Sequence, residues 1–220
     1  MILTTMPRLV LTFISTYRDM KKKFLYFIAA VVVLLGVMLV AGNINSPQTN
    51  RRAREHAEAA LAYCQRNGMS TDYCFLVDFD VHSGKNRFFV WDFNKQRIVY
   101  STICEHGRGR GSTHMRAEFS NEPGSNCSSL GRYQVLNRRM MYRHKNTPCI
   151  VLRGMDSSNS RALSRGILIH PSVWQFPSFP IPAMWRTEGC FGLSRRGFDT
   201  VDNYRKASSR PILLWAYAED

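Results

Sequence analysis

Acidic residues are scarce in this chain: 16 Asp and Glu stand against 30 Lys and Arg in 220 residues, which gives a net charge of +14 at pH 7. This excess indicates a partner with negative groups, and nucleic acid, an anionic membrane and a cell-wall polymer all fit. Charge alone does not choose among the three. Hydrophobic residues make up 45% of the chain, which excludes disorder over its full length. The lack of a Gly-X-Y period or a longer repeat excludes collagen and solenoids.

The cysteines lack the spacing of the common metal and redox motifs. No two of the six form a CxxC pair, so neither a zinc ribbon nor a thioredoxin-like motif is predicted. Six are also too few for a disulfide-rich miniprotein. The histidines include no HxxxH pair, so no metal ion is predicted. Disulfide pairing in an oxidising compartment stays open for Cys64, Cys74, Cys104, Cys127 and Cys149.

One uncharged stretch near the N-terminus is long enough to cross a membrane. Residues 24–42 carry no charged side chain and directly follow Lys21, Lys22 and Lys23. A helix of this length spans roughly 28 Å, close to the thickness of a bilayer core. The lysines in front of it place the rest of the chain outside the cytoplasm. We therefore expect a membrane-anchor helix at 24–42, with a cleaved signal peptide as the alternative.

The other boundaries follow from changes in composition. Residues 1–23 form a cytoplasmic tail ahead of the apolar run. Met20 directly precedes three lysines and resembles a natural start, so we expect that residues 1–19 are not translated. A mass spectrum of the cellular protein tests this. Residues 43–50 are polar and form a linker, and residues 51–220 are long enough to bury one core.

The spacing of apolar residues predicts one amphipathic helix followed by strands. Residues 51–67 place small and apolar side chains on one stripe, and Gly68 follows as a helix-ending residue. The predicted strands are 73–80, 86–93, 96–103, 133–136, 150–153, 167–170 and 212–217. The predicted loops are 104–131 and 171–189. With one more short helix at 197–206, the pattern indicates a mostly-β sandwich or barrel.

Cys190 differs from the other cysteines in its surroundings. It lies between two glycines, Gly189 and Gly192, at the end of a Pro-rich loop, and glycine lets a backbone approach a substrate closely. The N–H groups of Gly189 and Cys190 can point at a developing oxyanion. A small buried cysteine in a turn is the structural alternative.

His170 is the candidate base for this thiol. It ends the apolar strand and precedes Pro171 and a loop, a position that faces a cleft. It can take the thiol proton and hold an imidazolium beside the thiolate, which would lower the pKa of Cys190. The carbonyl oxygen of Pro171 can orient the imidazole. A structural histidine that caps the strand is the alternative.

Several motifs in one order carry a resemblance to a known family. They are AALAYCQRNGMS, FLVDFDVHSGKNRFFVWDF, His106-Gly107, residues 119–125, residues 128–133, LRGMDSSNSRALSRGILIHPS and Thr187-Glu188-Gly189-Cys190. This order and spacing resembles the murein L,D-transpeptidase catalytic domain family, bacterial cysteine enzymes that act on peptidoglycan stem peptides. The resemblance runs from about residue 51 to residue 219 and implies a β-sandwich-like catalytic domain.

The resemblance implies roles for the matched residues. Cys190 is the nucleophile, His170 is its base and Gly189 belongs to the oxyanion turn. The residues placed in or near the substrate groove are His106, Gly107, Ser128, Ser129, Gly131, Arg165 and Thr187. The arginines expected to face stem carboxylates are Arg108, Arg110, Arg132 and Arg165. No cofactor and no metal is implied.

The chain departs from the wider family pattern beside the cysteine. That pattern has Ser-His-Gly-Cys, with an arginine or asparagine two residues after the cysteine. Here Thr187 keeps a hydroxyl, whereas Glu188 brings a negative charge that raises the pKa of Cys190 unless it points away. Gly192 replaces the later arginine or asparagine, which leaves the contacts to a substrate carboxylate unassigned.

The expected reaction is acyl transfer through a thioester on Cys190, which joins stem peptides in a 3–3 crosslink. One alternative is an L,D-carboxypeptidase that trims tetrapeptide stems with water as acceptor. Another is a membrane-anchored cell-wall-binding protein without catalysis. We expect the body at the periplasmic face of the inner membrane, or free in the periplasm if residues 24–42 are cleaved. A nucleic-acid partner conflicts with an exported body, and the oligomeric state stays open.

Overall fold

The computed structural model describes residues 8–109, 111–141, 147–172 and 187–219. Contacts within the chain divide it into two units, Met1–Ala41 and Gly42–Asp220. The two units are described separately, and the second contains every candidate site residue.

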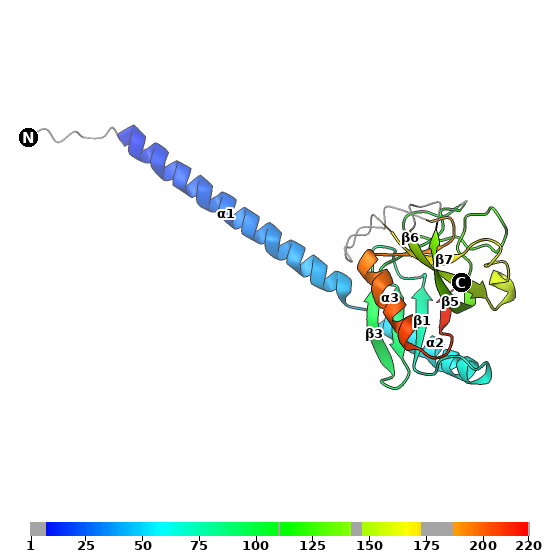
Figure 1. The fold of residues 1–220 in the computed structure, drawn as a ribbon. Coiled ribbons are helices and arrows are strands. Elements are labelled where there is room, and N and C mark those ends of the chain that lie inside the picture. Colours follow the sequence, from blue (N-terminus) through cyan, green and yellow to red (C-terminus); the bar gives the residue numbers. More distant parts are fainter. Residues whose placement is uncertain (1–7, 110, 142–146, 173–186, 220) are drawn as a thin grey trace, which may run out of the picture. The chain divides into compact units, whose positions relative to one another are not determined.

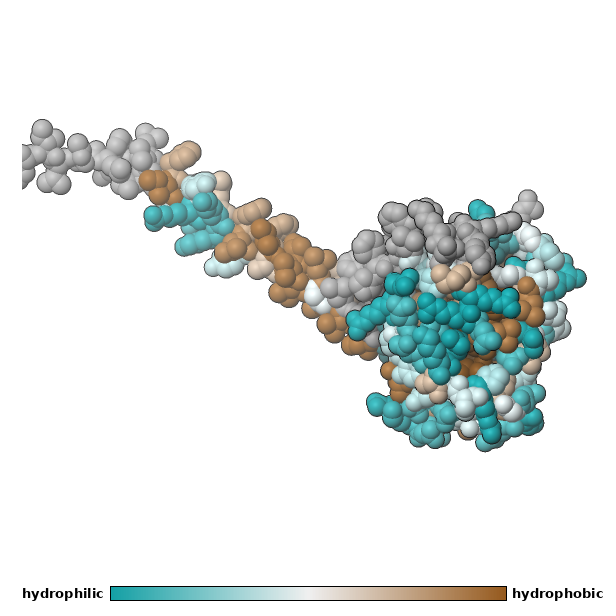
Figure 2. All heavy atoms as spheres, viewed as in Figure 1, coloured by the Kyte–Doolittle hydropathy of each residue, from teal (hydrophilic) through white to brown (hydrophobic). Residues whose placement is uncertain are grey.

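The described residues of the first unit, from residue 8 onward, belong to one long helix, α1 (Arg8–Asn43) (Figure 1). Its large apolar side chains are exposed in this unit, for example Phe24 at 65% and Val33 at 66%. Figure 2 shows this apolar surface next to a hydrophilic stretch of the same helix. Among the residues that the structure describes, no helix has a stretch that is long and apolar enough to be assigned as a membrane span.

Helix α2 (Pro47–Arg66) opens the second unit and begins ahead of the predicted start at residue 51. The Ser46 side chain accepts a hydrogen bond from the Thr49 N–H at 3.0 Å, and Pro47 occupies the first turn, where a missing N–H costs nothing. Gly68 follows the helix with a φ of 64°, as predicted. The buried stripe of the helix contains Ala53, Ala57, Ala60 and Cys64.

One nine-stranded sheet forms the body of this unit, in the order β3-β2-β1-β9-β5-β6-β7-β8-β4. The strands are β1 (Tyr73–Asp78), β2 (Phe88–Asp92), β3 (Arg97–Thr102), β4 (Cys104–Glu105), β5 (Gly131–Met141), β6 (Thr147–Gly154), β7 (Leu168–Pro171), β8 (Phe191–Leu193) and β9 (Leu213–Tyr217). Only β1–β9 and β7–β8 pair in parallel within the described residues. The mostly-β prediction is confirmed, and each predicted strand overlaps an observed one. The two shortest strands, β4 and β8, were not predicted.

Helices cover both faces of the sheet. The stripe of α2 packs with one cluster, which includes Leu76 and Phe89. Helix α3 (Arg195–Ala207) confirms the predicted helix at 197–206, and its Phe198 packs in the other cluster with Ile169 of β7 and Phe191 of β8. Successive side chains of a strand point to opposite faces. The residues next to Ile169 and Phe191 therefore point away from the α3 core, and these residues include the candidate site.

Candidate active site

The turn that carries Cys190 is closed by the hydroxyl of Thr187. The Thr187 Oγ1 donates to the Cys190 carbonyl oxygen at 2.6 Å and accepts from the Gly189 N–H at 3.2 Å. Thr187 is itself fixed, because its N–H donates to the His106 carbonyl oxygen at 2.8 Å. The hydroxyl retained at position 187 thus shapes the backbone on which the thiol sits.

Position 189 in this turn requires glycine. Its φ is 112°, a region that residues with a Cβ rarely adopt. A Cβ there would lie 2.7 Å from the Cys127 carbonyl oxygen. The Gly189 carbonyl accepts from the Ser128 Oγ at 3.2 Å, and its N–H is used inside the turn. Gly189 therefore fixes the position of Cys190.

His170 is oriented as the sequence predicted. Its Nδ1 lies 3.1 Å from the carbonyl oxygen of Pro171. A carbonyl oxygen only accepts hydrogen bonds, so we assign the proton of the neutral ring to Nδ1. Nε2 is then the ring nitrogen that accepts a proton.

The strand register places His170 and Cys190 on one face of the sheet. In the parallel pair β7–β8, His170 lies opposite Gly192 and Ile169 lies opposite Phe191. Cys190 is two residues before Gly192, so its side chain shares the face of Gly192 and of His170. The Cys190 Sγ lies 3.6 Å from the Gly166 carbonyl oxygen, just before β7. The register, carried one residue back, thus puts Cys190 level with Leu168, two residues before His170, on the same face of two adjacent strands.

The thiol of Cys190 is neutral in this arrangement. Burial raises its pKa to about 11; the charges of Cys149 and Glu188 add to the rise, and a backbone hydrogen bond from Leu168 and the charge of Arg165 oppose it. Loss of hydration therefore outweighs the favourable contacts in the substrate-free state, and the lowering of this pKa by an imidazolium at His170 stays a prediction. The proton must leave when the substrate reacts.

Glu188 points toward Arg108, whose Nη2 lies 2.5 Å from its Oε1. Both side chains are more than half exposed, so water screens the pair. The unfavourable effect of Glu188 on Cys190 that the sequence predicted is present, but the neighbouring guanidinium offsets part of the charge.

Arg165 donates hydrogen bonds to the loop of residues 120–129. Its Nη1 donates to the Ser120 carbonyl oxygen at 2.8 Å and to the Ser129 Oγ at 2.6 Å. Its Nη2 donates to the Cys127 carbonyl oxygen at 2.6 Å. The guanidinium thus binds the loop that carries Ser128, which in turn holds Gly189, and its contact with a substrate carboxylate stays a prediction.

His106 lies beneath the site, in the core, and not on a groove wall. It is 1% exposed. Its Nδ1 accepts from the Arg87 Nη2 at 2.6 Å, because an arginine only donates, and its Nε2 bonds to the Thr113 carbonyl oxygen at 2.8 Å. Both ring nitrogens are engaged by the protein itself, so the ring has a structural role here, and the groove role of His106 stays a prediction.

Other residues predicted to line the groove also have contacts within the protein. A Cβ on Gly107 would lie 2.3 Å from the Asn126 carbonyl oxygen, and one on Gly131 would lie 2.9 Å from Asp156 Oδ2. The Gly107 N–H donates to the Ser128 Oγ at 3.0 Å. Arg132 pairs with Asp156, and Arg110 lies outside the described residues.

The other five cysteines are buried and free in this structure. They are Cys64, Cys74, Cys104, Cys127 and Cys149. Only Cys190 is partly exposed, which separates it from the rest as the thiol a substrate can reach.

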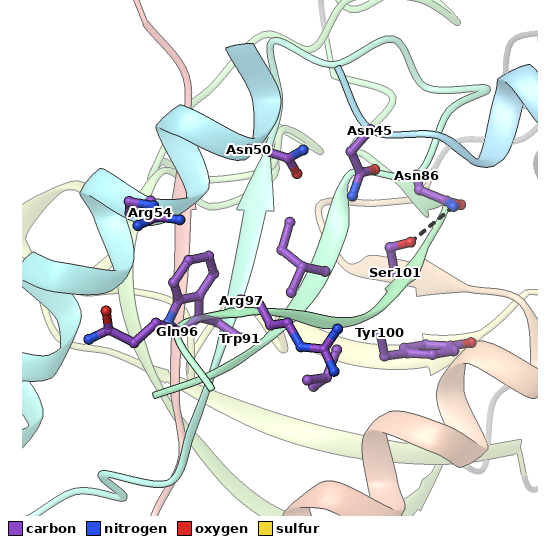
Figure 3. A pocket seen from close by; sticks show the side chains of 11 residues that line it. Asn45, Asn50, Arg54, Asn86, Trp91, Gln96, Arg97, Tyr100 and Ser101 are labelled. Carbon is purple, nitrogen blue, oxygen red and sulfur yellow. Dashed lines mark hydrogen bonds between the residues drawn. The ribbon is translucent and has the colours of Figure 1, made fainter. Parts of the chain in front are cut away.

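A hollow of about 590 Å³ lies at the β3 edge and includes no member of the Cys190 turn. Figure 3 shows its lining of amide, guanidinium and aromatic side chains, with the Asn86 Nδ2 donating to the Ser101 Oγ at 3.1 Å. Its described lining contains neither cysteine, histidine nor carboxylate. The described lining therefore offers neither an imidazole nor a carboxylate to act as base for its Ser101 hydroxyl.

Comparison with known proteins supplies the family. The family model of the L,D-transpeptidase catalytic domain matches residues 45–215, which include Cys190, His170 and both loops around them. The chain therefore belongs to the L,D-transpeptidase catalytic domain family, and the resemblance seen in the sequence is confirmed. A comparison with curated proteins finds no match.

Several solved structures are similar to this chain at low identity. Bd1075 of Bdellovibrio bacteriovorus is 13% identical, with 69% of this chain and 49% of that chain covered and a TM-score of 0.44. The helical cell shape determining protein Pgp2 of Campylobacter jejuni is 9% identical, with 67% and 48% covered and a TM-score of 0.44. A mutant L,D-transpeptidase of Enterococcus faecium is 10% identical, with 66% and 50% covered and a TM-score of 0.40. This chain spans about half the length of each.

Proposed function

We propose that this protein is a peptidoglycan L,D-transpeptidase that forms 3–3 crosslinks through a thioester on Cys190. The observation that carries the proposal is the placement of Cys190 and His170 on one sheet face, with the His170 Nδ1 held by the Pro171 carbonyl oxygen. A partly exposed thiol beside an oriented imidazole is the arrangement that nucleophilic acyl transfer requires.

The first half of the reaction transfers the donor stem to sulfur. His170 Nε2 takes the Cys190 proton as the sulfur attacks the carbonyl carbon between the diamino acid and the terminal D-alanine. The tetrahedral intermediate expels the D-alanine amine, which receives the proton from His170. The products are a thioester on Cys190 and free D-alanine.

The second half returns the enzyme to its starting state. An amine of a neighbouring stem attacks the thioester carbon and loses its proton to His170. The carbon–sulfur bond breaks, and the proton passes to sulfur. The cleaved peptide bond supplies the energy, so neither a nucleotide nor a metal enters the scheme.

The raised pKa of Cys190 explains why the base is needed. With a pKa of about 11, roughly one thiol in ten thousand is ionised at pH 7. Transfer of the proton to His170 during attack supplies the thiolate where the substrate is bound, and the resting thiol stays protected from other electrophiles.

Residues 24–42 support a location at the periplasmic face of the inner membrane. The stretch is uncharged and follows three lysines, the order expected of an anchor with its basic side in the cytoplasm. Cell fractionation, with and without residues 1–42, tests this part of the proposal.

Product analysis tests the activity. The full chain is incubated with tetrapeptide muropeptides, and the products are separated and weighed. We expect 3–3 crosslinked dimers and free D-alanine from the wild type, and neither from Cys190→Ala. Tripeptide monomers without dimers would assign the carboxypeptidase reaction instead. Unchanged muropeptides with both proteins would reject catalysis and leave wall binding.

A further inference from the structure

Glu105 is a buried carboxylate in the same row of residues as His170. It is 3% exposed and lies on the short strand β4, opposite Gly192 of β8. Gly192 in turn lies opposite His170 of β7. Directly opposed residues on adjacent strands share a face of the sheet. Glu105, Gly192 and His170 therefore form one row across three strands on the site face.

The Glu105 carboxylate fills the space above Gly192. A Cβ on Gly192 would lie 2.3 Å from the Glu105 Oε2, so no side chain fits there while the carboxylate holds this position. The departure from arginine or asparagine at position 192 thus has a structural consequence. Where the wider family pattern has a cation or an amide, this chain has an anion that reaches over from the next strand.

The carboxylate also reaches as far as the end of β7. The Ser172 Oγ donates to the Glu105 Oε1 at 2.7 Å. Ser172 is two residues after His170 and shares its face. One carboxylate oxygen thus contacts the chain just beyond His170 while the other lies over Gly192, the residue opposite His170.

We propose that Glu105 is a positioning residue that stabilises the imidazolium of His170 when His170 takes the proton of Cys190. The proposal rests on the proposed function for its use of that proton transfer. A nearby negative charge favours the protonated form of an imidazole. Because burial disfavours ionisation of the Cys190 thiol, a charge that favours the receiving group reduces the free energy needed for the transfer.

Among the described residues, the strands on either side of β7 place two cysteines and one arginine toward His170 or in its row. Cys190 approaches from the side of β8. Strand β6 pairs Ile150 with Ile169. Continuing this register by one residue places Cys149 opposite His170. On the next strand, Arg139 of β5 lies opposite Cys149.

The described charges nearest the site on other segments have protein partners of their own: Arg165, whose charge also acts on Cys190, binds the carbonyl oxygens of Ser120 and Cys127. Helix α3 packs on the opposite face, and its buried Asp202 is paired with Arg138. Glu188, before β8, is paired with Arg108. Glu105 is therefore the carboxylate whose position depends on Gly192 and whose charge lies along the row of His170.

The test is the protonation of His170, measured by NMR titration of the imidazole in the full chain. The signal is assigned by its absence from His170→Gln. Glu105→Gln keeps the size of the side chain and an oxygen for Ser172 but removes the charge. In this variant we expect the titration midpoint of His170 to fall by about one pH unit relative to the wild type. Glu58→Gln, on the exposed face of α2, is the matched control and leaves the midpoint unchanged.

Gly192→Ala provides an independent second variant. Its methyl group displaces the carboxylate, so the midpoint falls as in Glu105→Gln. In a Glu105→Ala background, Gly192→Ala has no carboxylate to displace. The double variant should therefore have the same His170 midpoint as Glu105→Ala alone. Glu105→Asp keeps the charge and restores part of the shift. A single midpoint shared by the wild type, Glu105→Gln and Gly192→Ala overturns the proposal.

Acylation is measured separately on the same proteins. A midpoint shift without any thioester on Cys190 refutes the proposed function and leaves the electrostatic coupling intact. A thioester on Cys190 without a midpoint shift refutes the role of Glu105 alone. With both present, the acylation rate of Glu105→Gln falls most above the midpoint of the wild type, where His170 is neutral in both proteins and only its weaker basicity differs, and the deficit shrinks below that midpoint, a pH dependence that a purely structural role would not produce.

Discussion

The two faces of the β7–β8–β4 end of the sheet hold two histidines with different surroundings. His106, on the core side, is 1% exposed and has both ring nitrogens engaged, one by Arg87 and one by a carbonyl oxygen. His170, on the other side, is half-buried and has its Nδ1 oriented by the Pro171 carbonyl oxygen. The comparison teaches that burial and the partner of Nδ1, an arginine donor for His106 and a carbonyl acceptor for His170, and not proximity to the cysteine in sequence, separate a structural histidine from a candidate base.

His170→Ala is expected to have the largest effect on activity. Loss of the base slows acylation by about 10²–10⁴-fold, whereas the free energy of unfolding changes by less than about 1 kcal/mol because the ring is only half-buried. Rates of D-alanine release and urea unfolding curves measure the two effects. Acylation at the wild-type rate across pH 6–9 would remove His170 from the mechanism.

His106→Ala is expected to show the opposite pattern. The substitution removes a buried ring and leaves the Arg87 Nη2 without its acceptor, so the free energy of unfolding falls by about 3 kcal/mol. Activity per folded molecule falls less than in His170→Ala. If His106→Ala left stability unchanged and abolished acylation, the assignment of the two histidines would be reversed.

Alkaline pH should lower the free energy of unfolding because the protein contains buried thiols. Burial raises the pKa of Cys64 and of Cys104 to about 12 from an ordinary value of 9.0. Above pH 9 the unfolded chain loses thiol protons that the native chain keeps, which favours unfolding. The stability that the protonated buried thiols contribute is therefore complete below pH 9 and is lost as the pH rises toward 12. We expect about 1 kcal/mol per thiol at pH 10.

Urea unfolding under reducing conditions at pH 7 and pH 10 measures this loss. Cys104→Ala should lower stability at pH 7 but reduce the difference between the two pH values. An unchanged difference would show that Cys104 is not the group that titrates.

The smallest expected effect concerns the exposed pair before β8. Glu188→Gln removes a charge that raises the pKa of Cys190, so alkylation of Cys190 by iodoacetamide at pH 7 should become about twofold faster. Arg108→Gln leaves Glu188 without its partner and should slow the same reaction. Equal rates in both variants would show that solvent screens the pair completely.

Much of the sheet could be predicted because its strands are rich in aromatic and β-branched residues with turn signals between them. Strands β4 and β8 could not, because two or three residues give no period to recognise. The short strands matter most for the site, since β8 follows Cys190 and β4 carries Glu105. Only pairing with longer neighbours makes these segments extended.

The pair Cys190 and His170 could be found because glycines beside a cysteine and a histidine at a strand end are local signals. The roles of Arg165 and His106 could not, because their partners lie in segments distant in sequence, at Ser120, Cys127 and Arg87. Arg87 is fully buried, and the one available signal was a charge inside an apolar strand segment. The raised pKa of Cys190 depends on burial, which no local pattern reports.

The most direct test of the account is the mass of the protein during reaction with a tetrapeptide donor. We expect the intact full chain to gain the mass of the donor without its terminal D-alanine, and peptide mapping to place this acyl group on Cys190. Cys190→Ala should gain no mass, with an unfolding curve like that of the wild type. An adduct on another residue, or the same adduct on Cys190→Ala, would contradict the assignment of Cys190 as the nucleophile.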